Sequence, residues 1–107
     1  MRTQQEPTRI IRIYLSGPIE VAKQIIRAHC LVEGLCVTIE PTVYIYTGGE
    51  ESGYVVGLLN YPRFPTDAEA LDRKAEDLAV KLLHGTHQHS VLVVTPEQSF
   101  WHTKREG

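Results

Sequence analysis

Two long β-type segments occupy the middle of the chain. Residues 35–46 alternate between apolar and polar positions, and residues 54–61 are apolar on both faces. Alternation with a period of two is typical of a β-strand, and a strand that is apolar on both faces is typical of the centre of a sheet. The segment between them, residues 47–53, contains three glycines. Two β-rich segments joined in this way predict a β-hairpin. Because Pro41 cannot donate a hydrogen bond to a neighbouring strand, we expect the first strand to lie at a sheet edge or to carry a bulge.

The segment before the hairpin predicts a strand followed by a helix. Residues 9–15 alternate, with Ile11, Ile13 and Leu15 on one face. Pro18 suits the first position of a helix, and Gly34 suits the left-handed residue that ends one. Between them, a stripe of apolar residues predicts the buried face of the helix, comprising Ile19, Ala22, Ile25, Ile26 and Cys30.

The segment after the hairpin predicts a second helix and a further strand. Thr66 and Glu69 have the spacing of a capping box, in which each side chain bonds the other residue's backbone N–H. Beyond them, apolar residues recur at steps of three and four until Gly85, as expected for an amphipathic helix. Residues 90–95 predict a strand, and residues 100–104 are a weaker extended stretch.

This order of elements predicts a ferredoxin-like βαββαβ fold of the α+β class. Right-handed crossovers would place the strands in a four-stranded antiparallel sheet with spatial order 4-1-3-2 and both helices on one face. We expect residues 1–107 to form one domain, with an N-terminal arm at 1–8 and a C-terminal extension at 96–107. The uncovered face would carry Ile10 and Tyr14 beside the apolar second strand of the hairpin. An apolar sheet face that no helix covers predicts a homo-oligomer.

Composition narrows the classes of function. The chain has 107 residues, is 42% hydrophobic and carries a formal net charge of −2. A slight acidic excess disfavours nucleic acid as a partner, because binding to a phosphate backbone normally needs a basic surface. Residues 1–9 lack the apolar run of a signal peptide, and no segment is long and apolar enough to span a membrane. We therefore expect a cytoplasmic protein, with Cys30 and Cys36 packed as small apolar residues.

One stretch of the chain resembles a known family. Residues 31–52 read LVEGLCVTIEPTVYIYTGGEES, in which Leu31-Val32-Glu33 ends a helix and Tyr44-Ile45-Tyr46-Thr47-Gly48 closes a strand with spaced aromatics and a glycine. This pattern resembles the CutA family, small trimeric ferredoxin-like proteins related in architecture to the PII signalling proteins. The resemblance implies a trimer and a binding or regulatory module without settled catalysis.

The hairpin is the first candidate for a ligand site. Its glycines allow a ligand to approach the backbone closely, and its acids and hydroxyls supply polar contacts. Tyr54 and Arg63 add donors along or just beyond the following strand, and Arg63 suits an anionic ligand. An ordinary solvated turn has the same composition, so both interpretations stand. The candidate residues are Thr47, Gly48, Gly49, Glu50, Glu51, Ser52, Tyr54 and Arg63.

A second candidate is the histidine-rich segment before the last strand. Imidazole is the commonest nitrogen ligand for zinc or copper, and His87 and His89 would share one face if the strand has begun. No acidic residue or cysteine stands nearby in the sequence to complete a metal site. The alternative is a polar loop, and we expect no cofactor.

The favoured function is a non-catalytic oligomeric module that binds a small ligand, a nucleotide or another anion, in clefts between subunits. One alternative is a small enzyme that uses a tyrosine or histidine in an inter-subunit pocket as acid or base. Another is a protein-interaction or RNA-binding module. Ile13-Tyr14-Leu15 and Gly53-Tyr54 resemble the aromatic motifs of RNA-recognition domains, although Val56 replaces one aromatic residue of the second motif.

Overall fold

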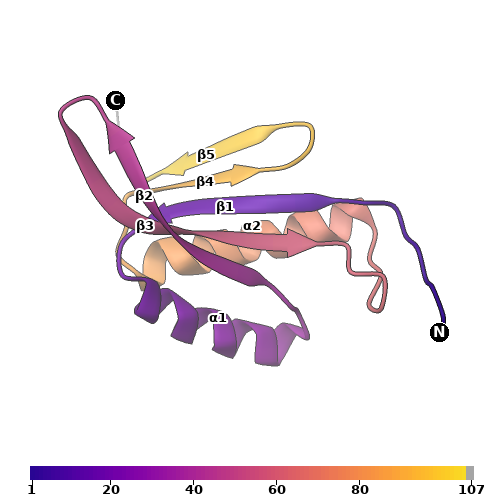
Figure 1. The fold of residues 1–107 in the computed structure, drawn as a ribbon. Coiled ribbons are helices and arrows are strands. Elements are labelled where there is room, and N and C mark those ends of the chain that lie inside the picture. The colour runs from indigo at the N-terminus through magenta and orange to yellow at the C-terminus, as the bar shows by residue number, and fades with distance from the viewer. Residues whose placement is uncertain (106–107) are drawn as a thin grey trace.

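A computed structural model describes residues 1–105 and contains two helices and one antiparallel sheet (Figure 1). Both helices lie on the same side of the sheet, so the opposite side is open (Figure 1). The elements follow in the order β1 (Ile10–Ser16), α1 (Ile19–Glu33), β2 (Thr38–Tyr46), β3 (Gly49–Leu59), α2 (Ala68–Gly85), β4 (Ser90–Val94) and β5 (Ser99–Thr103).

The sheet has five strands in the order β2-β3-β1-β4-β5, and every neighbouring pair is antiparallel. The predicted order of the first four strands is confirmed, but the prediction of a four-stranded sheet is wrong. The C-terminal extension supplies the fifth strand, β5, which pairs with β4 from Ser90↔Thr103 to Val94↔Ser99. The α+β class is confirmed. β2 lies at the sheet edge, as expected for a strand that contains Pro41.

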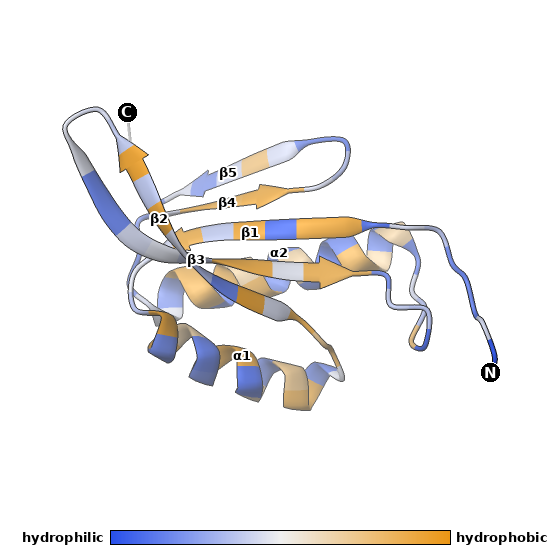
Figure 2. Cartoon of the chain, viewed as in Figure 1, coloured by the Kyte–Doolittle hydropathy of each residue, from blue (hydrophilic) through white to orange (hydrophobic). Residues whose placement is uncertain are grey.

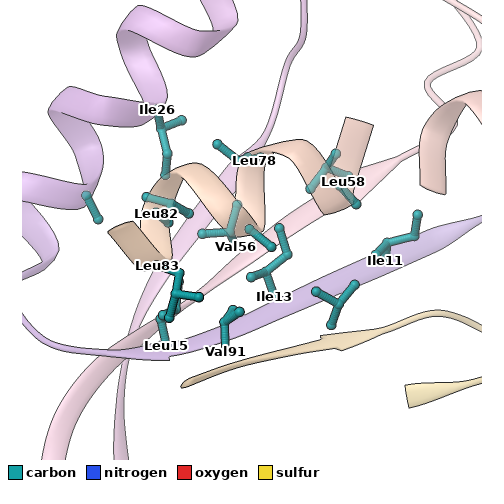
Figure 3. Close-up of a cluster of buried hydrophobic side chains, with 14 of the residues drawn as sticks. Ile11, Ile13, Leu15, Ile26, Val56, Leu58, Leu78, Leu82, Leu83 and Val91 are labelled. Atoms are coloured by element: carbon teal, nitrogen blue, oxygen red, sulfur yellow. The ribbon is translucent and has the colours of Figure 1, made fainter. Parts of the chain in front are cut away.

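The core lies between the helices and the inner face of the sheet. Alternate residues of β1 and β3 point into it, and the apolar stripe of α2 packs on them (Figure 3). Figure 2 shows hydrophobic and hydrophilic residues interspersed along α2, as expected for a helix with one apolar face. Ile11, Ile13, Val56, Leu58 and Leu78 are all fully buried. Since side chains on a strand alternate between faces, burial of this set turns the intervening residues of β1 and β3 toward the open side.

The helix ends are set by local chemistry. Gly34 ends α1 in the left-handed region, with φ 63° and ψ 40°, as predicted. The cap of α2 differs from the predicted capping box. Asp67, not Thr66, is the N-cap residue, and its carboxylate accepts a hydrogen bond of 2.8 Å from the backbone N–H of Ala70. The Thr66 backbone N–H donates instead to the side-chain oxygen of Asn60, which holds the loop before the helix.

The hairpin is longer and its turn tighter than the sequence predicts. β3 begins at Gly49 rather than at Tyr54, so only Thr47 and Gly48 form the turn. Gly48 has φ 86°, a conformation that favours glycine. The predicted loop over residues 47–53 is therefore wrong, because most of it pairs with β2 in a regular ladder. β2 also starts three residues later than predicted, at Thr38.

The two cysteines have different environments. Cys30 is half-buried at the end of α1, and burial raises the pKa of its thiol. Cys36 is exposed, so the expectation that both are packing residues is wrong for Cys36. Across residues 1–105, no helix has the length and apolarity needed to cross a membrane.

Candidate functional site on the open face of the sheet

The open face of the sheet carries a group of polar and aromatic side chains where β1, β2 and β3 meet. On β1 the outward-facing residues are Tyr14 and Ser16, which lie opposite Val55 and Gly53 of β3. On the far side of β3, Tyr44 of β2 lies opposite Glu51. Residues distant in sequence are therefore brought together by strand register alone.

Gly53 makes this meeting possible because it has no side chain. A β-carbon at this position would lie 2.3 Å from the carbonyl oxygen of Leu15 and 2.5 Å from a ring carbon of Tyr44. The space is filled instead by the Tyr44 ring. Its hydroxyl shares a hydrogen bond between the carbonyl oxygens of Leu15, at 3.2 Å, and Tyr54, at 3.1 Å. The ring of Tyr44 is thus fixed across three strands.

Ser16 and Glu51 form a polar pair beside this ring. The Ser16 hydroxyl donates a hydrogen bond of 2.8 Å to Oε1 of Glu51, and the other carboxylate oxygen stays available. Burial raises the pKa of Tyr44, and the nearby negative charge of Glu51 raises it further. Tyr44 therefore stays a neutral hydroxyl beside the Ser16–Glu51 pair.

Aromatic residues enclose one side of the pair. Trp101 of β5 lies opposite Leu92 of β4, which in turn lies opposite Tyr14 of β1. The three side chains form a row across β1, β4 and β5, and Trp101 is 62% exposed. Together with Tyr44 and Glu51, this row lines a shallow hollow of about 350 Å³.

A carboxylate beside aromatic faces suits a particular class of ligand. Aromatic rings attract cations to their faces and also stack on planar bases, and the carboxylate pairs with positive charge. The hydroxyl of Ser16 and the second oxygen of Glu51 can bond to the hydroxyls of a sugar. The hollow thus offers a carboxylate, aromatic surface and hydroxyl groups to a ligand.

The structure places the predicted ligand-binding residues in three different regions. Among the hairpin residues, only Glu51 lines the hollow; Glu50 points to the opposite face, and Thr47 and Gly48 form the distant turn. Gly49 and Ser52 lie in β3 on either side of the acids. Tyr54 is fully buried on the helix side, where burial raises the pKa of its hydroxyl.

Arg63 is not part of this group. It follows the far end of β3, a strand of 11 residues and thus about 35 Å in length at about 3.3 Å per residue. Its guanidinium lies over the ring of Phe64, 5.4 Å from the ring centre. The hairpin and Arg63 therefore cannot contact one small ligand within a single chain.

The histidine-rich segment lies between α2 and β4. His87 has φ 55°, a left-handed conformation in the connecting turn, and so does not share a strand face with His89. Within residues 1–105, no three side chains of the His, Cys, Asp and Glu types are grouped as a metal site would require.

Sequence reasoning missed most of the residues that line the hollow. Ser16 lies just after the strand predicted over residues 9–15, in the break before the helix, and was given no functional role. Trp101 lies in β5, which the sequence indicated only weakly. A usable signal existed for Tyr14 and Tyr44, because both fall on the polar side of an alternating strand. An aromatic residue on the side away from the core is a candidate for binding.

Comparison with solved structures identifies proteins of similar fold. No protein-family model and no curated protein sequence matches the chain. A phage SAM lyase in its apo state is 17% identical, with a TM-score of 0.69 over 92% of this chain and 91% of the lyase. The phage SAM lyase in complex with S-methyl-5′-thioadenosine is also 17% identical, with a TM-score of 0.67 over 99% of this chain and 98% of the other. CutA from Synechococcus elongatus PCC7942 is 22% identical, with a TM-score of 0.51 over 88% of this chain and 80% of CutA.

These matches confirm one expectation and overturn another. The resemblance to CutA is confirmed at the level of the fold. The expectation of a non-catalytic binding or regulatory module is contradicted, because the protein that matches over nearly the whole chain with a TM-score of 0.67 is an enzyme. The alternative of a small enzyme is the better supported of the two. At these identities the likeness is one of fold, so the chemistry of this chain has to be argued from its own residues.

Proposed function

We propose that this protein is a lyase that acts on S-adenosylmethionine (SAM) and releases S-methyl-5′-thioadenosine. The observation that carries the proposal is the Ser16–Glu51 pair beside Tyr14, Tyr44 and Trp101, on a fold shared over 99% of the chain with a SAM lyase that binds this thioether. SAM combines a planar base, a ribose and a positively charged sulfur. This is the class of ligand that the hollow suits.

The residues of the hollow divide into two roles. Trp101 is exposed and Tyr14 is half-buried, and both offer aromatic surface on which the adenine can stack. The carboxylate of Glu51 supplies negative charge for the sulfonium, and the hydroxyl of Ser16 holds that carboxylate in place. Tyr44 is a positioning residue, because its own hydroxyl is already bonded to two backbone oxygens.

The proposed reaction needs few catalytic groups. Release of S-methyl-5′-thioadenosine breaks the bond between the sulfur and the Cγ of the methionine chain, and the electron pair of that bond goes to sulfur. The leaving group is a neutral thioether, so no acid has to protonate it. At Cγ the broken bond is replaced in one of two ways. The substrate's own carboxylate attacks Cγ and forms the C–O bond of a lactone, or the carboxylate of Glu51 takes a proton from Cβ and the electron pair of that C–H bond forms an alkene. A positioned carboxylate and an enclosed surface are sufficient for either route.

The proposal includes assembly with further copies of the chain. The hollow is shallow in one chain, and the open face also exposes Ile10, Leu59 and Trp101. A second copy lying on this face would exclude water from the bound sulfonium. We therefore propose a ferredoxin-like core, extended by β5, in a single domain that forms a homo-oligomer, with a trimer favoured. Light scattering should give a mass above that of one 12.1 kDa chain.

The test is direct. Purified protein is incubated with SAM, and S-methyl-5′-thioadenosine is quantified by chromatography with mass detection. We expect Glu51→Gln to reduce its formation by about 10²-fold or more, the range seen when one electrostatic group of an active site is removed. Glu33→Gln, an exposed acid at the end of α1, is the matched control and should retain activity. Absence of product from the wild-type protein above a buffer blank would rule out the proposal.

A further inference from the structure

The open face of the sheet has a second hollow next to the first. It has a volume of about 380 Å³, and its lining includes Arg12, Thr38, Glu40 and Gly57. Tyr14 lines both hollows, so they lie next to each other on either side of this side chain. Nothing in the proposed lyase site described so far uses the charged groups of the second hollow.

Gly57 forms the floor of this hollow. It lies in the middle of β3, with Arg12 of β1 on one side and Thr38 of β2 on the other. A β-carbon on Gly57 would approach the Thr38 hydroxyl to 2.5 Å. Because Gly57 has no side chain, a trench lies over β3 between the side chains of β1 and β2, the two strands that flank it.

Two opposite charges stand on the sides of the trench. Arg12 is in register with Gly57, and Glu40 is in register with Val55, two residues along β3. Adjacent strands are about 4.8 Å apart, so β1 and β2 lie about 10 Å apart across β3. Both side chains are exposed, and neither forms an ion pair among residues 1–105. An unpaired cation and an unpaired anion thus face one trench.

We infer that Arg12 and Glu40 bind the α-carboxylate and the α-ammonium of an amino acid, namely the methionine end of the substrate. The inference rests on the proposed function and extends it to recognition of the whole molecule. A guanidinium accommodates a carboxylate with two parallel hydrogen bonds, and a carboxylate on the other wall pairs with an ammonium. A zwitterion places these groups on one carbon, between the two walls.

The amino-acid end of such a substrate has to extend from the first hollow into the second. Arg12 and Ser16 are four residues apart on β1, which corresponds to about 14 Å along a strand. With the sulfonium beside Glu51 and Ser16, the methionine end would extend over β3 toward Glu40, where the long side chain of Arg12 can reach it. The thioether product lacks the amino acid and would leave the second hollow empty.

The test compares ligands that differ only in the amino-acid end. S-adenosylhomocysteine carries the zwitterion but no reactive sulfonium, whereas S-methyl-5′-thioadenosine carries no amino acid. Their affinities are measured by calorimetry for the wild-type protein and for Arg12→Gln and Glu40→Gln. We expect each substitution to weaken S-adenosylhomocysteine by about 10- to 100-fold, as for loss of a hydrogen bond between charged groups. Binding of S-methyl-5′-thioadenosine should stay within about twofold. Arg27→Gln, an exposed arginine on the helical face, is the control and should change neither affinity.

The outcomes separate the inference from the proposed function. If the wild-type protein neither binds the thioether nor forms it from SAM, the proposed function fails. If it does both, yet Arg12→Gln and Glu40→Gln leave S-adenosylhomocysteine binding unchanged or weaken both ligands equally, the amino-acid subsite alone is refuted. Light scattering of both variants checks that the assembly is retained, and a changed mass together with loss of thioether binding would assign these residues to the subunit contact and overturn the inference.

Discussion

Substitution of Gly53 by alanine should damage both the fold and the hollow. The added β-carbon would lie 2.3 Å from the Leu15 carbonyl oxygen and 2.9 Å from the Cα of Ser16, both of which are backbone atoms of the central strand β1. Neither can move away as the end of a flexible side chain would. The third contact, at 2.5 Å, is the Tyr44 ring. The strands therefore have to separate locally, or the ring has to leave its place.

The cost follows from these contacts. Overpacking of a closely packed site costs about 1–3 kcal/mol, and loss of the Tyr44 hydrogen bond adds about 0.5–1.5 kcal/mol. Alanine has less conformational entropy than glycine in the unfolded chain, and this difference stabilises the folded protein by about 0.4–1 kcal/mol. We expect Gly53→Ala to lower the free energy of unfolding by about 2 kcal/mol, with a range of about 0.5–4 kcal/mol.

Urea denaturation measures this change. Gly49→Ala is the matched control, since it lies in the same strand and its added carbon would meet only the Tyr46 side chain, at 3.1 Å. It should change the free energy of unfolding by less than about 0.5 kcal/mol. Tyr44→Phe removes the hydroxyl alone, and in the Gly53→Ala background it should cost nothing further, because the bond is already broken. Equal stability of Gly53→Ala and Gly49→Ala would refute the close packing of β1, β3 and Tyr44.

Three further changes test other parts of the structure. Leu78→Ala should lower the free energy of unfolding by about 2–5 kcal/mol in urea, because this fully buried leucine leaves a cavity in the core; a loss below about 1 kcal/mol would place it outside the core. His29 is 3% exposed and has no hydrogen-bond partner among residues 1–105. Burial, followed by the charge of Lys81, lowers its pKa from 6.5. The charges of Glu33 and Asp77 oppose this lowering only in part. Stability is therefore full above pH 6.5 and decreases as the pH falls through the lowered pKa, and His29→Leu should flatten a plot of melting temperature against pH in this range. Arg63→Ala should fold and lose less than about 1 kcal/mol, the size of an exposed cation–π contact, as measured by urea denaturation; a larger loss would mean that the guanidinium has further contacts.

Regular periodicity predicted the parts of the fold that bury apolar surface. The three- and four-residue spacing of α2 and the alternation of β1 depend only on which residues face the core, and both elements lie within a few residues of their predicted positions. The start of β3 was missed because Gly49 and Gly53 have low strand propensity. Hydrogen bonding to β2 holds these residues in a strand in spite of their low propensity. This pairing cannot be inferred from the glycines alone.

The candidate site was only partly predictable for a related reason. Glu51 was expected to contribute from a flexible turn, but it contributes from a strand, where register places it beside Ser16. Trp101 depends on β5, an edge strand of five residues without a buried apolar face. Strand register brings together residues that are distant in sequence. A single sequence does not indicate which of these residues will pair.

The ladder of β3 has a consequence for the order in which the molecule loses activity and structure. β3 pairs with β1 only from Gly53 to Leu59. Glu51 lies before this stretch and pairs with β2 alone, so it belongs to a ribbon of only two strands. In this ribbon Val43 and Ile45 are 53% and 80% exposed. Such a ribbon can open locally at a free energy well below that of global unfolding. Opening would part Glu51 from Ser16 while the core stays intact. We therefore expect amides of the ribbon to exchange with deuterium before those of β1, and heating to inactivate the protein several degrees below its melting temperature.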